Sequence, residues 1–159
     1  MKSHITKPKF FGNNKKRMKS GNNGDIKEDE IQITKIANEF FDLFTNTGNR
    51  IPNLEDIKKI FLSDGLIINN SFEEPSIYDL ESFIRPRVEI LTNGTLTNFK
   101  EQETHHKTEI CGNIAQRKCN YKKSGELNGK PFEGEGLKLM QFIRACLGFW
   151  DKEKMGISA

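Results

Sequence analysis

The chain has 159 residues, of which 35% are hydrophobic and 30% are charged, and its formal net charge is +3. This length suits one domain that buries a sizeable core, and the composition is polar but globular. No apolar run approaches the roughly 20 residues that a membrane-spanning helix needs, which excludes a helical membrane protein.

The positive charge is concentrated in residues 1–24, which hold seven Lys or Arg and no acidic residue. The rest of the chain carries 18 basic against 22 acidic groups. We expect a disordered basic tail over 1–24 and a single α+β domain over 25–159. A basic arm could contact nucleic-acid phosphates. A solvated tail is the simpler interpretation, because short basic runs are weak motifs.

Cysteine usage and the N-terminus indicate the compartment. Cys111, Cys119 and Cys146 form an odd count without paired spacing, which is typical of free thiols in a reducing environment. No apolar segment follows the basic start, so a secretory signal is not expected. The sequence therefore predicts a cytoplasmic location.

Two segments in the first half of the chain predict helices. Residues 25–44 carry an apolar stripe at helical spacing, formed by Ile33, Ile36, Ala37, Phe40, Phe41 and Phe44. Asn53 is a candidate N-cap for a short second helix. Its predicted buried side consists of Leu54, Ile57, Ile60 and Phe61. Residues 66–70 then predict a short strand.

A third helix is expected to start at Pro75-Ser76, with Ser76 and Asp79 as a capping pair. Pro86 falls inside its apolar stripe and predicts a kink or an interruption. Arg85 and Arg87 flank this proline, and one of them could reach an anionic ligand. The residues expected to face inward are Ile77, Leu80, Phe83, Ile84, Val88 and Leu91.

The second half of the chain predicts a meander of three long antiparallel strands. Two-residue hairpin signals stand at 112–113 and 128–129. If both turns form, register places His106 opposite Cys119, and Cys119 opposite Lys138.

Side-chain alternation divides this meander into two faces. The face with fewer charges is expected to pack against the helices. It carries Gln102, Thr104, His106, Thr108, Ile110, Ala115, Arg117, Cys119, Tyr121, Gly134, Gly136, Lys138, Met140 and Phe142. The outer face includes Glu101, Glu103, His105, Gln116, Lys118, Asn120, Leu137, Leu139 and Ile143. A single β-bulge would exchange the faces beyond it.

Helices followed by a long curved meander resemble the nuclear transport factor 2-like (cystatin-like fold) superfamily, nearest its SnoaL-like and uncharacterised small-domain branches. The segments that carry the resemblance are Ile33–Phe44, residues 60–68, Phe99–Glu103, Gly112–Arg117 and Gly134–Arg144. The resemblance implies a cone-shaped α+β fold, a pocket between helices and sheet, and a dimer through the outer sheet face. It does not specify a function, because this superfamily includes enzymes and association domains.

The end of the chain departs from the superfamily pattern. After Arg144 such domains usually have a Gly-Trp pair and a last strand, whereas residues 151–154 lack strand alternation. We therefore expect this last strand to be atypical or shortened, with an exposed sheet edge if it is missing.

Candidate chemistry lies on the inner face. A thiolate at Cys119 beside His106 and Lys138 could be a nucleophile. His106 with Tyr121 could instead act as an acid–base or carbonyl-polarising pair, so both are candidate catalytic residues. A satisfied interior network is the third interpretation. The predicted pocket-lining residues are Phe40, Phe44, Tyr78, His106, Arg117, Cys119, Tyr121, Lys138 and Met140.

No cofactor or metal site is expected. Glu101, Glu103 and His105 have the residue types of a metal site, but one strand spreads them over roughly 13 Å. No phosphate loop or zinc motif occurs in the sequence.

Three classes of function remain. The first is a small-molecule-binding domain, with isomerase, dehydratase or cyclase-type chemistry as an extension. The second is a non-catalytic association module, with Leu137, Leu139 and Ile143 forming a homodimer contact. The third is nucleic-acid contact through the basic arm.

Overall fold

The computed structural model describes residues 23–144 and 150–158. Most of the predicted tail, residues 1–22, lies outside the described residues, as does Cys146. The first elements are α1 (Asn23–Asp42), the 3₁₀ helices η1 (Thr47–Asn49) and η2 (Leu54–Lys59), β1 (Ile67–Asn69), β2 (Ser76–Tyr78) and α2 (Leu80–Thr92). Four strands follow, β3 (Leu96–Cys111), β4 (Ile114–Leu127), β5 (Lys130–Arg144) and β6 (Trp150–Ser158).

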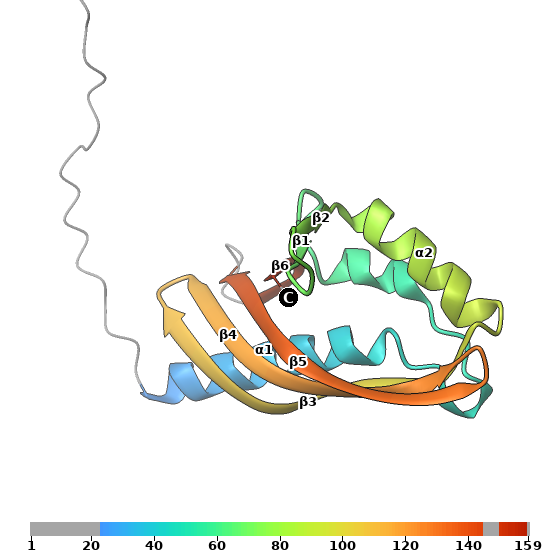
Figure 1. Cartoon of the computed structure of the whole chain (residues 1–159). Coiled ribbons are helices and arrows are strands. Elements are labelled where there is room, and N and C mark those ends of the chain that lie inside the picture. Colours follow the sequence, from blue (N-terminus) through green and yellow to red (C-terminus); the bar gives the residue numbers. More distant parts are fainter. Residues whose placement is uncertain (1–22, 145–149, 159) are drawn as a thin grey trace, which may run out of the picture.

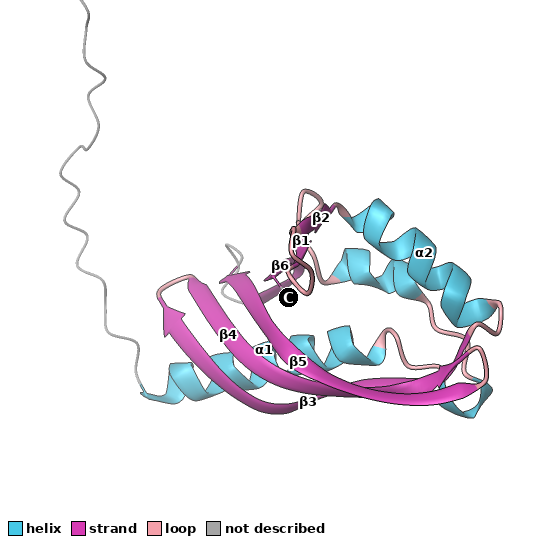
Figure 2. Ribbon diagram, viewed as in Figure 1, coloured by secondary structure: helices cyan, strands magenta, loops and turns pink. Residues whose placement is uncertain are grey.

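The strands form one sheet in the order β2-β1-β6-β5-β4-β3. The long strands β3, β4 and β5 curve, and the helices occupy their concave side (Figures 1 and 2). The α+β class and the helical first segment are confirmed. Among the described residues, no helix is both long and apolar enough to cross a membrane.

The last strand of the sheet is present. β6 pairs antiparallel with β5 and parallel with β1, so both of its edges have a partner strand. It has 9 residues, fewer than the 14 to 16 of the three long strands. Backbone pairing on both sides thus stabilises β6, although residues 151–154 lack the apolar–polar alternation typical of a strand.

The two hairpin turns set the register of the meander as expected. Asn128 (φ 51°) and Gly129 (φ 73°) both have positive φ, as a type I′ turn requires. His106 lies opposite Cys119, and Cys119 lies opposite Lys138. These predictions are confirmed.

A β-bulge at Thr104 overturns part of the predicted face assignment. The register of β3 against β4 shifts between Glu103 and His105, which leaves Thr104 as the extra residue. On the N-terminal side of Thr104, the side chains of β3 therefore lie on the face opposite to the predicted one. The predicted outward positions of Glu101 and Glu103 are therefore wrong, since their side chains point inward and are only 10% and 9% exposed. Gln102 and Thr104, which were expected inside, are exposed.

The start of α2 also differs from the prediction. Ser76–Tyr78 forms β2, and Asp79 is the N-cap of a helix that begins at Leu80. The Asp79 carboxylate accepts a hydrogen bond from the backbone N–H of Ser82 (2.7 Å), so the capping partner is Ser82. Ile77, expected inside, is 65% exposed because it stands on β2. Capping by Asp79 and pairing of β2 with β1 together move the helix start.

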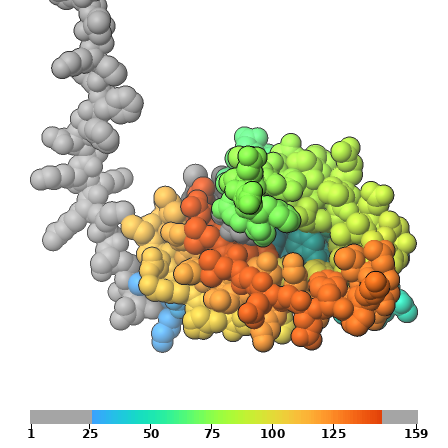
Figure 3. Space-filling view, in the orientation of Figure 1, coloured from blue at the N-terminus to red at the C-terminus, as the bar shows by residue number. Residues whose placement is uncertain are grey.

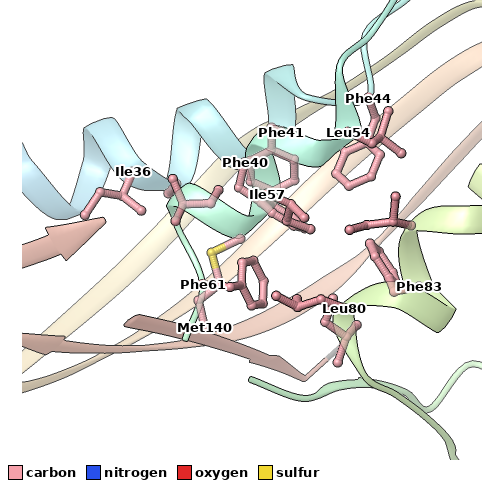
Figure 4. Packing of buried hydrophobic residues seen from close by; sticks show 14 of the residues in the cluster. Ile36, Phe40, Phe41, Phe44, Leu54, Ile57, Phe61, Leu80, Phe83 and Met140 are labelled. Atoms are coloured by element: carbon pink, nitrogen blue, oxygen red, sulfur yellow. The ribbon is translucent and has the colours of Figure 1, made fainter. Parts of the chain in front are cut away.

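Phenylalanine side chains fill the space between helices and sheet (Figure 4). The Phe40 ring contacts those of Phe41, Phe44 and Phe61, with centroids 5.3 to 5.9 Å apart. Phe61 directly follows η2. The predicted apolar stripe of the first helix therefore packs against the η2 segment. Such rings contribute most of the buried apolar area of this core.

Asn46 connects three chain segments. It is 8% exposed, and its side-chain amide donates to the carbonyls of Leu91 (3.1 Å) and Leu96 (2.7 Å). Its side-chain oxygen accepts from the Phe99 N–H (2.6 Å), and its own N–H donates to the Phe99 carbonyl (3.0 Å). These bonds lie at the second register shift of β3, between Thr97 and Lys100. Asn46 therefore helps to fix which face the following residues of β3 present.

Candidate functional site

A cavity of about 400 Å³ opens between α2, β1 and the sheet. The surface is hollowed between β5 and the segment around β1 (Figure 3). Five lining side chains are ionisable, namely Arg87, Glu101, Tyr121, Lys123 and Lys138. The apolar wall consists of Phe44, Ile67, Phe83, Ile90, Leu91, Leu96, Phe99, Leu127 and Phe132.

The Lys138 ammonium on β5 forms an ion pair with Glu101 of β3 on the cavity wall. The two side chains are 9% and 10% exposed. The Lys138 nitrogen also lies 3.4 Å from the centroid of the Tyr121 ring. Burial lowers the pKa of Lys138, while Glu101 opposes this shift and the neighbouring Lys123 adds to it. The bulge at Thr104 makes the pair, because it turns Glu101 inward.

Tyr121 lies across β5 because residue 136 is glycine. A Cβ at Gly136 would stand 2.6 Å from the Tyr121 hydroxyl oxygen and 2.7 Å from Cζ of the ring, closer than any side chain tolerates. Burial raises the pKa of Tyr121, and Glu101 adds to this. The hydroxyl is thus kept protonated and can donate a hydrogen bond into the cavity.

Arg87 follows Pro86 inside α2, which continues to Thr92. One N–H of its guanidinium donates to the Phe83 carbonyl (2.9 Å), and its Cζ lies 3.5 Å from the centroid of the Phe83 ring. Burial lowers the pKa of Arg87, and Tyr78 and Glu101 act in the opposite direction. The stacking fixes the guanidinium against the cavity wall.

A second cluster surrounds Arg117, which is 0% exposed. Its Nε and Nη2 donate to the two carboxylate oxygens of Glu103 at 2.8 and 2.5 Å. Its Nη1 donates to the hydroxyls of Thr34 on α1 (3.2 Å) and Thr108 (3.0 Å). Burial alone would raise the pKa of Glu103, but the bonds and charge of Arg117, with His106, hold it below its usual value.

His106 and Cys119 belong to the edge of this second cluster. The His106 Nδ1 lies 2.6 Å from Glu103 Oε1, and the side chain is 42% exposed. Cys119 is 0% exposed. Burial, followed by the charge of Glu103, raises the pKa of Cys119 to about 12. A thiol with such a pKa is not a nucleophile at neutral pH, which argues against a catalytic cysteine.

No family model and no curated protein matches this sequence. Solved structures do match. A nuclear transport factor 2-like superfamily protein from Salmonella enterica superposes with a TM-score of 0.63 at 11% identity, over 84% of this chain and 92% of the other. The chain has the nuclear transport factor 2-like fold.

Two further structures of similar shape are instructive. The Kfla4162 protein from Kribbella flavida has a TM-score of 0.63 at 13% identity, covering 84% of this chain and 92% of that one. The hexachlorocyclohexane dehydrochlorinase LinA-type3 from Novosphingobium barchaimii has a TM-score of 0.63 at 12% identity, covering 86% and 89%. At these identities the likeness is one of fold.

Within this nuclear transport factor 2-like fold, the predicted site residues lie in three places. Phe44, Tyr121 and Lys138 line the cavity. The core and the Arg117 cluster contain Phe40, Cys119, Met140 and Arg117, each at most 1% exposed. Tyr78 packs edge-on against Phe83, with ring centroids 6.2 Å apart, and His106 stands beside Glu103. The structure thus separates His106 from the cavity wall that carries Tyr121.

Two lining residues were differently placed by sequence reasoning. Glu101 was assigned to the outer face, because no Gly or Pro marks the bulge at Thr104. Arg87 was one of two arginines flanking Pro86, either of which could reach an anionic ligand, and the sequence did not indicate which. His105 remains outside with Asn120 opposite it, away from Glu101 and Glu103. Across the described residues, no three His, Cys, Asp or Glu side chains are grouped as metal ligands.

Proposed function

We propose that the chain binds a small, mainly apolar molecule in the cavity, with a polar group of that molecule next to Tyr121, Lys138 and Glu101. The observation that carries this proposal is the convergence of these groups in a cavity whose other lining residues are mostly phenyl or aliphatic. A volume of about 400 Å³ falls within the range typical of small-molecule sites.

We further propose proton transfer on the bound molecule as the chemistry of this site. The Glu101 carboxylate is the general base, and the Tyr121 hydroxyl stabilises the oxygen on which negative charge develops. Lys138 holds Glu101 in place through their ion pair. We favour Glu101 over His106 as the partner of Tyr121, because Glu101 lines the cavity whereas His106 binds Glu103. Isomerisation and elimination can both proceed through such proton transfer.

Binding can be tested with N-phenylnaphthylamine, a neutral dye whose fluorescence rises in apolar surroundings. Ile90 lines the cavity, so Ile90→Trp should fill part of it and weaken the dye affinity by about tenfold or more. Ile114→Trp is the matched control, because Ile114 is 60% exposed on the outer face of the sheet. Failure of the wild-type protein to bind the dye, or equal losses in both variants, would contradict the proposal.

Proton transfer can be tested with nitrobenzisoxazole, whose ring opens when a base removes its C–H proton. We expect the wild-type protein to accelerate this reaction and Glu101→Gln to lower the rate by about 100-fold, as for loss of a general base. Glu109→Gln, at an exposed position of the same strand, should leave the rate unchanged. Equal rates for the wild type and Glu101→Gln would show that Glu101 is not the base.

A second candidate function, association of two copies, is favoured by the outer face of the sheet. Ile114, Leu137 and Ile143 are 60%, 45% and 41% exposed on neighbouring strands, and Leu139 is half-buried beside them. We propose a symmetric homodimer through this face. Sedimentation velocity at micromolar concentration should give a dimer for the wild type and a monomer for Leu137→Lys. A monomeric wild type would exclude this homodimer.

The basic arm of the third function class lies outside the described residues.

A further inference from the structure

The charges on the cavity wall do not balance. Three cations, Arg87, Lys123 and Lys138, stand against one carboxylate, Glu101. Lys138 is paired with Glu101. Arg87 and Lys123 form no ion pair with any described residue. The part of the chain that the structure describes therefore leaves two cavity cations without a carboxylate.

Arg87 is built into the wall and does not extend into solvent. Its guanidinium is stacked on the Phe83 ring at 3.5 Å, and one N–H is used by the Phe83 carbonyl. A guanidinium stays charged even when it is partly desolvated. A desolvated cation without a counter-charge is unfavourable, and an anion that enters the cavity removes that cost.

Lys123 approaches the same space from β4. Its aliphatic chain runs over Gly134, where a Cβ would stand 3.0 Å from the lysine Cε. Lys123 is close enough to Lys138 to contribute to lowering the pKa of that ammonium. The absence of a side chain at residue 134 thus gives a second cation room beside the Glu101 pair.

On the basis of the proposed ligand cavity, we infer that the bound molecule is a small apolar carboxylic acid whose carboxylate contacts Arg87 and Lys123. The planar fork of Arg87 matches the two oxygens of a carboxylate. The apolar part of the molecule then lies against Leu91, Leu96 and Phe99.

A single negative charge fits better than two. Glu101 lies on the same wall and near enough to Arg87 to influence its pKa. A phosphate dianion would add a second charge close to this carboxylate, whose repulsion is strong in apolar surroundings. Of the other uncharged lining side chains that the structure describes, nine are aliphatic or phenyl, and only Asn69, Ser71 and Tyr121 could donate hydrogen bonds to further phosphate oxygens.

The inference can be tested by displacement of the neutral dye N-phenylnaphthylamine. The competitors are naphthoate, the neutral naphthamide of the same shape, and naphthyl phosphate. For the wild type we expect naphthoate to displace the dye at about tenfold lower concentration than either of the others. Arg87→Gln should remove this preference while it still binds the dye. Arg85→Gln, at an exposed position of the same helix, should keep it.

Each outcome decides a separate point. Equal displacement by naphthoate and naphthamide in the wild type would overturn the inference while dye binding still supports the cavity. Stronger displacement by naphthyl phosphate would replace the carboxylate with a phosphate. A wild type that binds neither dye nor naphthoate would overturn the proposed function itself. If Arg87→Gln fails to fold, Arg87→Lys keeps the charge without the fork and should weaken the naphthoate preference.

Discussion

Two carboxylate–cation pairs on the inner face of the sheet are similarly buried but have different surroundings. Glu103–Arg117 and Glu101–Lys138 both use a β3 glutamate turned inward by the bulge at Thr104. The four side chains are at most 10% exposed. Every guanidinium nitrogen of Arg117 donates a hydrogen bond, to Glu103, to Thr34 of α1 or to Thr108. The Glu101–Lys138 pair instead faces a cavity.

This comparison shows that two ion pairs of similar burial can differ in whether they border a cavity. A buried pair whose hydrogen-bonding groups are all satisfied contributes to structural specificity. A pair of equal burial that borders an empty volume can exchange a partner for a ligand. The cavity, and not the pKa shift or the exposure, distinguishes the two.

The largest expected effect on stability comes from breaking the Glu103–Arg117 pair. Glu103→Ala leaves the Arg117 guanidinium buried without its counter-charge, which should lower the free energy of unfolding by about 3–5 kcal/mol. Urea denaturation measures it. Glu109→Ala, which removes an exposed carboxylate from the same strand, is the control and should leave stability unchanged. A loss for Glu103→Ala no larger than for the control would show that the pair is not structural.

The Glu103–Arg117 pair also predicts how stability depends on pH. The folded pKa of Glu103 is lowered, so its contribution is complete above the unfolded value of about 4.3 and is lost as pH falls through the folded pKa. When the pH is lowered from neutral to below the folded pKa of Glu103, the wild type should therefore lose more stability than Glu103→Gln does. Parallel curves of unfolding free energy against pH would contradict this.

Asn46 should come next in size, because it fixes the second register shift that precedes Glu101. Asn46→Ala leaves buried backbone groups of Leu91, Leu96 and Phe99 without partners and should cost about 2–3 kcal/mol. It should also weaken dye binding, since Glu101 loses its fixed position. Asn38→Ala on the exposed side of α1 should do neither. Unchanged stability would show that the register shift between Thr97 and Lys100 does not depend on the hydrogen bonds of Asn46.

A smaller effect is expected from Gly136→Ala. The added Cβ would overlap the Tyr121 ring, so the ring must move, at a cost of about 1–2 kcal/mol. Dye binding should weaken with it. Gly134→Ala is a matched control two residues away, where the contact is the flexible end of Lys123 and a small shift relieves it. Equal effects of both substitutions would contradict the proposed role of the Tyr121 position.

The smallest perturbation distinguishes the two cysteines that the structure describes. Cys111 is exposed, whereas Cys119 is buried beside Glu103 with a pKa of about 12. In the folded protein, iodoacetamide should therefore modify Cys111 and leave Cys119 unmodified, as peptide mass spectrometry can show. Rapid modification of Cys119 would mean that the Arg117 cluster opens readily.

The sequence predicted those features that local residues encode. The turn at Asn128-Gly129 sets the register that joins Cys119 to Lys138, and helical periodicity predicted the stripe that ends at Phe44. The bulge at Thr104 carries no local signal, so Glu101 and Glu103 were assigned to the wrong face and the cavity pair was missed.

Two other features depend on contacts between distant segments. Ser76–Tyr78 becomes a strand because Ile77 pairs with Ile68 of β1, which competes with a plausible capping pattern. The last strand is held between β5 and β1, and no alternation in residues 151–154 indicates it. Both depend on tertiary pairing that outweighs local preference.

The central claim is that Glu101 belongs to a ligand site and Glu103 does not. The most direct test is the affinity for naphthoate of Glu101→Gln and of Glu103→Gln, measured where both variants are folded. Removal of the cavity carboxylate should strengthen binding of this anion by about tenfold, because a like charge beside Arg87 is lost. Glu103→Gln should bind it as the wild type does. Equal naphthoate affinities for the two variants would contradict the account.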